Sequence, residues 1–265
     1  MSPARARPTK TRLVMPTAPP SSLKCWLDAG LSFFYPEVCQ VCGDGRASAD
    51  EGYVCTGCSA GVRFIKPPFC ERCGLPYEGE ITMAFECGNC REMELHFRQA
   101  RSAVAATGLA LEIIHRYKYQ QALWFEPFLA DLLVRVAKPD LSAAAWDVIV
   151  PVPLHPLKKR EREFNQAERL ARCLGRATGL PVDARLLRRV EFTRTQTLLT
   201  RPERAANVRR AFAVAPGRRL RGERIVVLDD VLTTGATTSA CAQALQAAGA
   251  GEVCVWTVAR GLGKP

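Results

Sequence analysis

The stretch Ile225–Thr237 reads IVVLDDVLTTGAT and decides the expected fold. Four apolar residues come first, the acids Asp229 and Asp230 follow, and a small polar turn leads on from them. This order predicts a buried strand over residues 225–228, a loop, and a helix over residues 237–248. A loop from a buried strand into a helix N-terminus is suited to hold a phosphate, because backbone N–H groups and the helix dipole converge there.

The chemistry of this turn points to a sugar phosphate. Its N–H groups and hydroxyls can face one concavity, and Gly235 lacks the Cβ that would block a close approach. Two acids at the carboxyl edge of a sheet can accept hydrogen bonds from two vicinal hydroxyls, and a ribose 5-phosphate offers both a diol and a phosphate. The alternative is a strand that ends in two solvated acids before a threonine-capped helix, but adjacent acids that close a buried strand have no packing use.

The stretch closely resembles the phosphoribosyl-pyrophosphate signature of type I phosphoribosyltransferases: four hydrophobic residues, Asp-Asp, two hydrophobic residues, Thr-Thr-Gly, a small residue and Thr. The resemblance implies that the chain binds phosphoribosyl pyrophosphate together with Mg²⁺. It also implies that the catalytic acids Asp229 and Asp230 hold the ribose hydroxyls. The 5-phosphate would lie against the five residues of the turn, which are Thr233, Thr234, Gly235, Ala236 and Thr237.

A basic cluster after an earlier strand is the candidate for the pyrophosphate end of the ligand. The strand is expected over residues 146–152, prolines stiffen its exit, and Lys158 and Arg160 follow in the run LKKRER. Pyrophosphate carries several negative charges, so cations and Mg²⁺ must neutralise it. Lys118, between two tyrosines after a helix, is a further candidate. The alternatives are a solvated basic turn for the cluster and, for Lys118, a lysine that only extends its charge into water.

Strands alternate with helices beyond residue 101, whereas the preceding part is rich in cysteine, glycine and short polar turns. The alternation predicts an α/β fold with a parallel sheet and helices on both faces, preceded by a small cysteine-rich module. The remaining elements are expected at residues 102–107 (strand), 109–136 (helices, with Pro127 starting the second), 165–178 (a helix that Gly179 ends) and 252–259 (strand).

Eight of the twelve cysteines form four CxxC pairs. Each pair curls so that both sulfurs face one point, and a second pair completes a tetrahedron around Zn²⁺. Four thiolates leave no open coordination position, so both ions would be structural. We pair the sets sequentially, with an interleaved arrangement as the rival. The expected ligands are Cys39, Cys42, Cys55 and Cys58 in the first ribbon, and Cys70, Cys73, Cys87 and Cys90 in the second.

The composition excludes some classes of protein. The 265 residues carry a formal net charge of +11, which suits phosphates, nucleic acid or acidic membranes without choosing among them. No apolar run is long enough for a transmembrane span, which needs about 20 residues. The N-terminus lacks the apolar core of a secretory signal, so we expect a cytoplasmic, reducing location in which paired cysteines bind metal. The other cysteines, Cys25, Cys173, Cys241 and Cys254, are expected in the core.

Four regions follow from these patterns. Residues 1–22 are expected to be a disordered basic tail, and residues 23–36 a short amphipathic helix. Residues 37–98 would form a double zinc ribbon, and residues 99–265 the α/β domain. Residues 194–212 are polar and basic, and we interpret them as a mobile flap over the site, the alternative being a surface loop with a basic helix.

Three stretches together are similar to the ComF family of competence-associated proteins: residues 151–171 (PVPLHPLKKREREFNQAERLA), residues 194–212 (RTQTLLTRPERAANVRRAF) and the phosphate loop. The resemblance implies an N-terminal zinc ribbon module and a type I phosphoribosyltransferase domain. It implies a part in DNA uptake during competence, with the competence machinery as partner, and the leading hypothesis is a phosphoribosyltransferase whose acceptor stays open. A second hypothesis is a non-catalytic accessory protein that binds single-stranded DNA and keeps the sugar-phosphate site as a sensor or DNA contact.

Overall fold

The computed structural model describes residues 37–79, 85–154, 164–190 and 211–262. The chain divides into Met1–Glu37 and a compact unit, Val38–Pro265. The predicted basic tail, the amphipathic helix that follows it and Cys25 therefore lie outside the described residues. Within the described ranges, each helix is too short or too polar to cross a bilayer.

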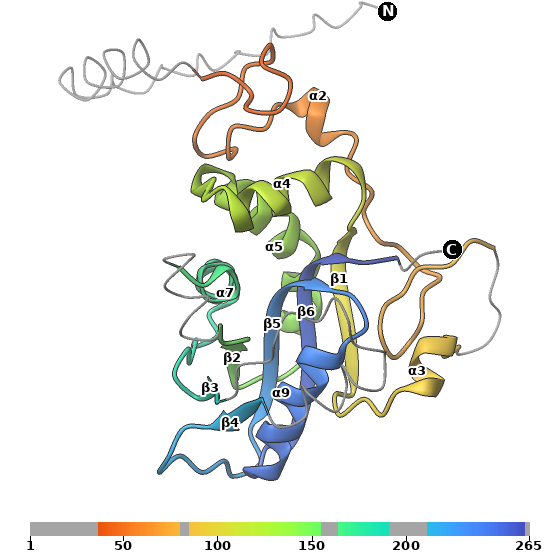
Figure 1. The fold of residues 1–265 in the computed structure, drawn as a ribbon, viewed down its shortest axis with the longest axis vertical. Coiled ribbons are helices and arrows are strands. Elements are labelled where there is room, and N and C mark those ends of the chain that lie inside the picture. The colour runs from red at the N-terminus through yellow and green to blue at the C-terminus, as the bar shows by residue number, and fades with distance from the viewer. Residues whose placement is uncertain (1–36, 80–84, 155–163, 191–210, 263–265) are drawn as a thin grey trace, which may run out of the picture. The chain divides into compact units, whose positions relative to one another are not determined.

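A four-stranded parallel sheet forms the centre of the compact unit (Figure 1). Its strand order is β1-β6-β5-β2, and all three neighbouring pairs run parallel. The parallel sheet predicted from the alternation of strands and helices is thus confirmed. The strands are β1 (Gln99–Ala105), β2 (Val148–Pro151), β5 (Arg224–Leu232) and β6 (Glu252–Arg260).

Helices connect the strands, and local sequence signals fix several of their ends. Pro127 lies in the first turn of α5, where its missing N–H costs nothing. The side chain of Asn165 caps the start of α7, and Gly179, with φ 78°, ends it in the left-handed conformation. The helices of this part are α4 (Gly108–Tyr119), the 3₁₀ turn η1 (Leu123–Phe125), α5 (Glu126–Ala143), α7 (Gln166–Thr178) and α9 (Ala236–Ala247).

Apolar side chains alternate between the two faces of the sheet along β5. Val226 and Leu228 pack with α4, α5 and α7, whereas Ile225 and Val227 pack with α9. Because successive strand residues point to opposite faces, a continuous apolar strand requires cover on both sides, as predicted. Cys241 and Cys254 lie in these cores, as expected, and Cys173 is partly buried.

Strand β5 is longer than the sequence predicted. It continues through both acids to Leu232 rather than ending at Leu228. The cause is its neighbour β6, which itself runs on to Arg260, so that Leu232 still has a ladder partner in Arg260. The two acids are therefore strand residues, and the loop that follows is short, since α9 already begins at Ala236.

A second, antiparallel sheet was not predicted. It pairs β3 (Leu187–Arg189) with β4 (Phe212–Val214). Three residues per strand are too few to show a periodic pattern in sequence. The two strands flank the predicted flap, of which all but residues 211 and 212 lies outside the described residues.

The cysteine-rich part forms two small modules, which we call the first ribbon (residues 38–65) and the second ribbon (residues 69–93). Each contains one short helix, α2 (Thr56–Ser59) in the first and α3 (Gly88–Glu92) in the second. Both share cores with the α/β part, on opposite faces of the sheet. Val54 and Val62 of the first ribbon join the core formed with α4, α5 and α7, while the cysteines of the second join the core formed with α9.

Candidate functional site

The two acids of β5 lie at the carboxyl end of the central sheet. By the alternation along the strand, Asp230 lies on the α4 face and Asp229 on the α9 face. Asp230 is buried, and its Oδ1 is 2.8 Å from Nζ of Lys118. Lys118 belongs to the last turn of α4, whereas the sequence placed it after a helix. The structure therefore joins two of the predicted site residues, Lys118 and Asp230, in one ion pair.

Burial and the neighbouring charges shift the pKa values of Asp229 and Lys118. Burial, together with the charge of Asp230, raises the pKa of Asp229 to about 7 against the opposing effect of Lys118. Oδ1 of Asp229 also accepts the backbone N–H of Asp230 at 2.9 Å. Burial acts to lower the pKa of Lys118, but the charge of Asp230, its hydrogen bond to the ammonium and the charge of Asp229 together outweigh burial, so the net shift is upward. Lys118 therefore stays charged, while Asp229 changes its protonation near neutral pH.

The loop after β5 leads directly into the N-terminus of α9. Gly235 is the N-cap residue, with φ 87°, and no side-chain hydrogen bond caps the helix there. The left-handed conformation favours glycine at this position for a second reason, besides the close approach that the missing Cβ allows. The first N–H groups of a helix have no partner within it, so this helix end can bind an anion. The predicted cradle residues Thr233, Thr234 and Thr237 are all at least partly exposed.

Several side chains that support the loop were missed in the sequence. Arg260, at the end of β6, is buried and donates from Nη1 to Leu232 O at 3.0 Å. Asn89, in the second ribbon, donates from Nδ2 to Thr234 O at 3.1 Å. No local pattern marks these residues, because their partners lie far away in the chain. Lys158 and Arg160, the predicted pyrophosphate ligands, lie outside the described residues.

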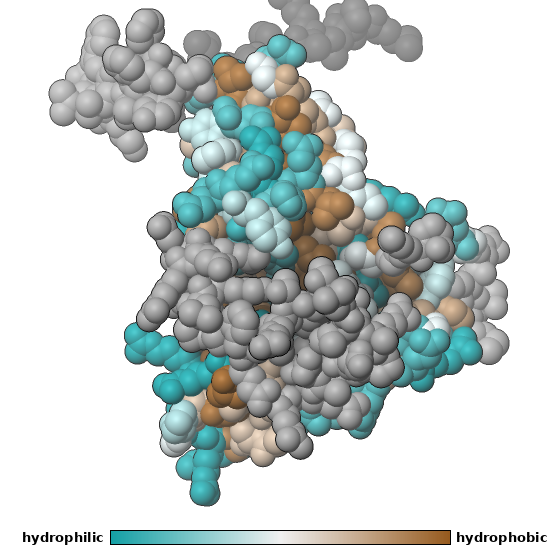
Figure 2. Space-filling view, in the orientation of Figure 1, coloured by the Kyte–Doolittle hydropathy of each residue, from teal (hydrophilic) through white to brown (hydrophobic). Residues whose placement is uncertain are grey.

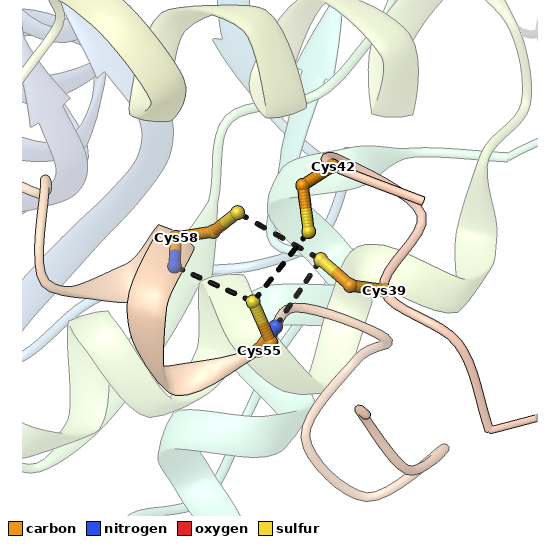
Figure 3. A group of neighbouring side chains, drawn as sticks. All are labelled: Cys39, Cys42, Cys55 and Cys58. Atoms are coloured by element: carbon orange, nitrogen blue, oxygen red, sulfur yellow. Dashed lines mark hydrogen bonds between the residues drawn. The ribbon is translucent and has the colours of Figure 1, made fainter. Parts of the chain in front are cut away.

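The eight paired cysteines form two clusters of four, grouped in the sequential order. Figure 3 shows the four sulfurs of the first cluster pointing toward one another. Sγ atoms are 3.9 Å apart for Cys39 and Cys58, and 3.8 Å apart for Cys42 and Cys55. In the second cluster the Sγ atoms are 3.7 Å apart for Cys70 and Cys90, 3.5 Å apart for Cys73 and Cys87, and 3.6 Å apart for Cys87 and Cys90. A tetrahedron with metal–sulfur bonds of about 2.3 Å has edges of about 3.8 Å, so both clusters fit Zn²⁺.

The fold and these sites together define the class of protein. A parallel α/β domain, with an acid pair and a glycine loop at the end of a central strand, is joined to two four-cysteine ribbons. The family model described as "Double zinc ribbon domain" matches residues 30–91.

Curated relatives cover most of the chain. Competence protein F of Haemophilus influenzae is 31% identical over 235 residues, which are 86% of this chain and 98% of that protein. The DNA utilization protein YhgH of Salmonella typhimurium is 30% identical over 230 residues, again 86% of this chain and 98% of that one. The chain therefore belongs to the competence protein F family.

Among solved structures, glutamine phosphoribosylpyrophosphate amidotransferase from B. subtilis is 26% identical, and the match covers 48% of this chain. It spans 24% of that enzyme, with a TM-score of 0.32, and at that score the likeness adds nothing to the fold described above.

Proposed function

We propose that the protein binds phosphoribosyl pyrophosphate with Mg²⁺ at the carboxyl end of β5, and acts as a phosphoribosyltransferase-like protein in the handling of DNA during competence. One observation carries the proposal: a strand that carries an acid pair near its carboxyl end runs through a glycine loop into a helix N-terminus whose N-cap residue, Gly235, has no side chain. The relatives named as competence and DNA utilization proteins support the biological setting.

Each part of the site would bind one part of the ligand. The 5-phosphate would accept hydrogen bonds from the N–H groups at the start of α9 and from the hydroxyls of Thr233, Thr234 and Thr237. Asp229 and Asp230 would accept the ribose hydroxyls. Lys118 binds Oδ1 of Asp230, and the other oxygen of that carboxylate can accept from a hydroxyl.

The pyrophosphate end needs positive charge. Mg²⁺ prefers oxygen ligands and would accompany the pyrophosphate, whose charge it neutralises. Lys158 and Arg160 would contribute further cations. Neutralisation favours transfer because the bond between C1 of the ribose and the pyrophosphate oxygen breaks with both electrons leaving on the pyrophosphate. The acceptor attacks C1 of the oxocarbenium-like sugar, and its proton passes to a base.

The experiment that tests the proposal is a calorimetric titration of phosphoribosyl pyrophosphate with Mg²⁺ against the wild type and Asp229→Ala/Asp230→Ala. We expect binding by the wild type and a loss of binding by the double variant. A wild type that does not bind would overturn the proposal. Release of pyrophosphate, followed with candidate acceptors, then separates a transferase from a sensor: binding without release with any acceptor favours the sensor.

A second candidate function is the accessory protein that contacts single-stranded DNA. Two exposed aromatic side chains favour it, Tyr119 at 61% and Trp124 at 43% exposure. The ring of Tyr119 also lies 4.7 Å from that of His115, tilted by 45°, and hydrophilic residues gather over α4 on the face shown in Figure 2. Bases stack on such aromatic rings while cations follow the backbone. Affinity for single-stranded DNA that falls with salt and with Tyr119→Ala would support this role, and no detectable affinity would exclude it.

A further inference from the structure

The second ribbon is tied to the phosphate loop through one buried arginine. Arg260 is 2% exposed and reaches in two directions. On the ribbon side, its Nε donates to Cys73 O at 3.1 Å and its Nη2 donates to Cys73 Sγ at 3.4 Å. On the loop side, its Nη1 donates to the carbonyls of Leu232, at 3.0 Å, and Thr233. The guanidinium therefore connects a metal ligand directly to the loop backbone.

A second link comes from inside the other knuckle of the same ribbon. Asn89, between Cys87 and Cys90, donates to Thr234 O at 3.1 Å. Three consecutive carbonyls, those of Leu232 at the end of β5 and of Thr233 and Thr234 in the loop, thus accept hydrogen bonds from Arg260 or from the second ribbon.

This arrangement has a consequence for the N–H groups of the loop. In a trans peptide the C=O and the following N–H point in opposite directions. Carbonyls held toward the ribbon therefore direct the N–H groups of Thr233, Thr234 and Gly235 away from it. These residues lead directly into the start of α9, whose N–H groups the proposed function assigns to the 5-phosphate.

The chain that leaves the second ribbon supports the start of α9 as well. Ser239 Oγ donates to Glu94 O at 3.2 Å and accepts the backbone N–H of His96 at 3.0 Å. The side chains of Leu95 and Phe97 pack beside Gly235. The ribbon itself lies close against β1: a Cβ on Gly74, whose φ is 65°, would stand 2.8 Å from Ala100 O. The second ribbon is thus packed closely against β1 at one end and linked to α9 at the other.

Charge gives a reason for placing a buried arginine there. A Zn²⁺ ion with four thiolates carries a net charge of −2, and a buried guanidinium is costly unless such a charge compensates it. The hydrogen bond from Arg260 to Cys73 Sγ is of the charge-assisted kind that orients a metal ligand. The residues present thus fit a metal centre of this composition.

The first ribbon is docked elsewhere. Nη1 of Arg116, in α4, donates to Gln40 O at 2.7 Å, and the N–H of Ile65 donates to Ala103 O in β1 at 3.0 Å. Its attachments go to α4, to α5 and to one edge of the sheet.

We infer that the second ribbon is the support that positions the phosphate loop, with Arg260 as the positioning residue, so that metal in the second cluster and ligand at the loop stabilise each other. The first cluster is not coupled in this way. The identity of the ligand rests on the proposed function, but the mechanical link does not.

The first test is metal release from the wild type. Coupling between two sites is reciprocal. With a chromogenic chelator in excess, phosphoribosyl pyrophosphate and Mg²⁺ should slow the release of one zinc per chain and leave the other unchanged. The inference would be contradicted if the ligand changed the release rates of both zinc ions, or if it changed neither rate.

The second test replaces the linking arginine. Arg260→Met keeps the length of the side chain and removes its charge and donors. We expect it to lose about 10- to 100-fold in affinity for phosphoribosyl pyrophosphate, and Arg260→Lys to recover part of that loss. The matched control is Arg116→Met, which removes the arginine that holds the first ribbon and should bind the ligand as the wild type does. Arg260→Met that retains two zinc ions and normal affinity would overturn the inference.

A third measurement is independent of the ligand. Backbone hydrogen exchange over residues 233–239 should accelerate in Arg260→Met, in the milder Asn89→Ala, and in wild type stripped of zinc. Unchanged hydrogen exchange in all three proteins would show that the second ribbon does not hold the loop in place. If the wild type does not bind phosphoribosyl pyrophosphate, the proposed function fails, while the exchange result still decides whether the ribbon holds the loop.

Discussion

The two ribbons have the same ligands and nearly the same spacing, yet their surroundings differ. In the second, all four cysteines are buried, whereas in the first Cys42 is exposed and Cys58 is partly so. The first ribbon joins the core on the α4 face of the sheet, where Asp230 lies, and the second joins the core on the α9 face, where Asp229 lies. Identical metal chemistry therefore serves two different tasks: the first ribbon covers helices, and the second supports the loop.

The largest expected effect comes from removing one ligand of the second cluster. Cys73→Ser should lose one zinc and, with it, much of the about 10–16 kcal/mol of apparent binding free energy of a structural zinc. It should also lose ligand binding, because Cys73 holds Arg260. The zinc content of the variant measures the first loss, and a titration with phosphoribosyl pyrophosphate measures the second.

Cys42→Ser is the matched change in the first cluster. It should also lose one zinc, but the affinity for phosphoribosyl pyrophosphate should stay within about twofold of the wild type, as for independent sites. An equal loss of ligand binding in Cys42→Ser and Cys73→Ser would contradict the claim that only the second ribbon supports the loop.

On the α4 face, the ion pair of Lys118 and Asp230 has side chains that are 19% and 10% exposed. Asp230→Ala leaves the ammonium without its partner, which should cost about 3–5 kcal/mol of stability in denaturant unfolding. Lys118→Met/Asp230→Ala removes both charges and should recover much of that loss. If the double variant is no more stable than Asp230→Ala, the loss of stability does not come from the unpaired ammonium of Lys118.

On the α9 face, the pKa of Asp229 is raised to about 7, against about 3.9 in an unfolded chain. The folded protein therefore keeps a proton that the unfolded chain releases, and its stability should fall as pH rises from about 4 to about 7. The loss should be on the order of 4 kcal/mol, and Asp229→Asn should flatten the slope. Parallel profiles for the two proteins would mean that another group sets the dependence.

The smallest effect is expected where the first ribbon docks. Arg116→Met removes the hydrogen bond to Gln40 O and the stacking of the guanidinium over Phe125. Each interaction is worth about 1 kcal/mol, so unfolding should become easier by about 1–2 kcal/mol. A loss of ligand affinity in this variant would show that the first ribbon also supports the site.

Much of the fold was readable because its signals are local. The four CxxC pairs predict two metal clusters, and the apolar runs predict buried strands. Asn165 and Gly179 mark the ends of α7 in the sequence itself. The extension of β5 to Leu232 was missed because a partner strand, β6, and not local propensity, holds it.

The support of the loop could not be read from the sequence at all. Arg260 and Cys73 are 187 positions apart, and an arginine that ends a strand looks like any solvated charge. The different surroundings of the two ribbons were hidden for the same reason, since the spacing of ligands within a ribbon says nothing about what covers it.

Hydrogen exchange of the wild type, with and without phosphoribosyl pyrophosphate and Mg²⁺, tests the central claim most directly. The account predicts slower exchange over residues 229–239, which contain the acids, the loop and the start of α9, and unchanged exchange over residues 38–62 of the first ribbon. Slower exchange confined to other segments, or none at all, would contradict a sugar-phosphate site at the end of β5.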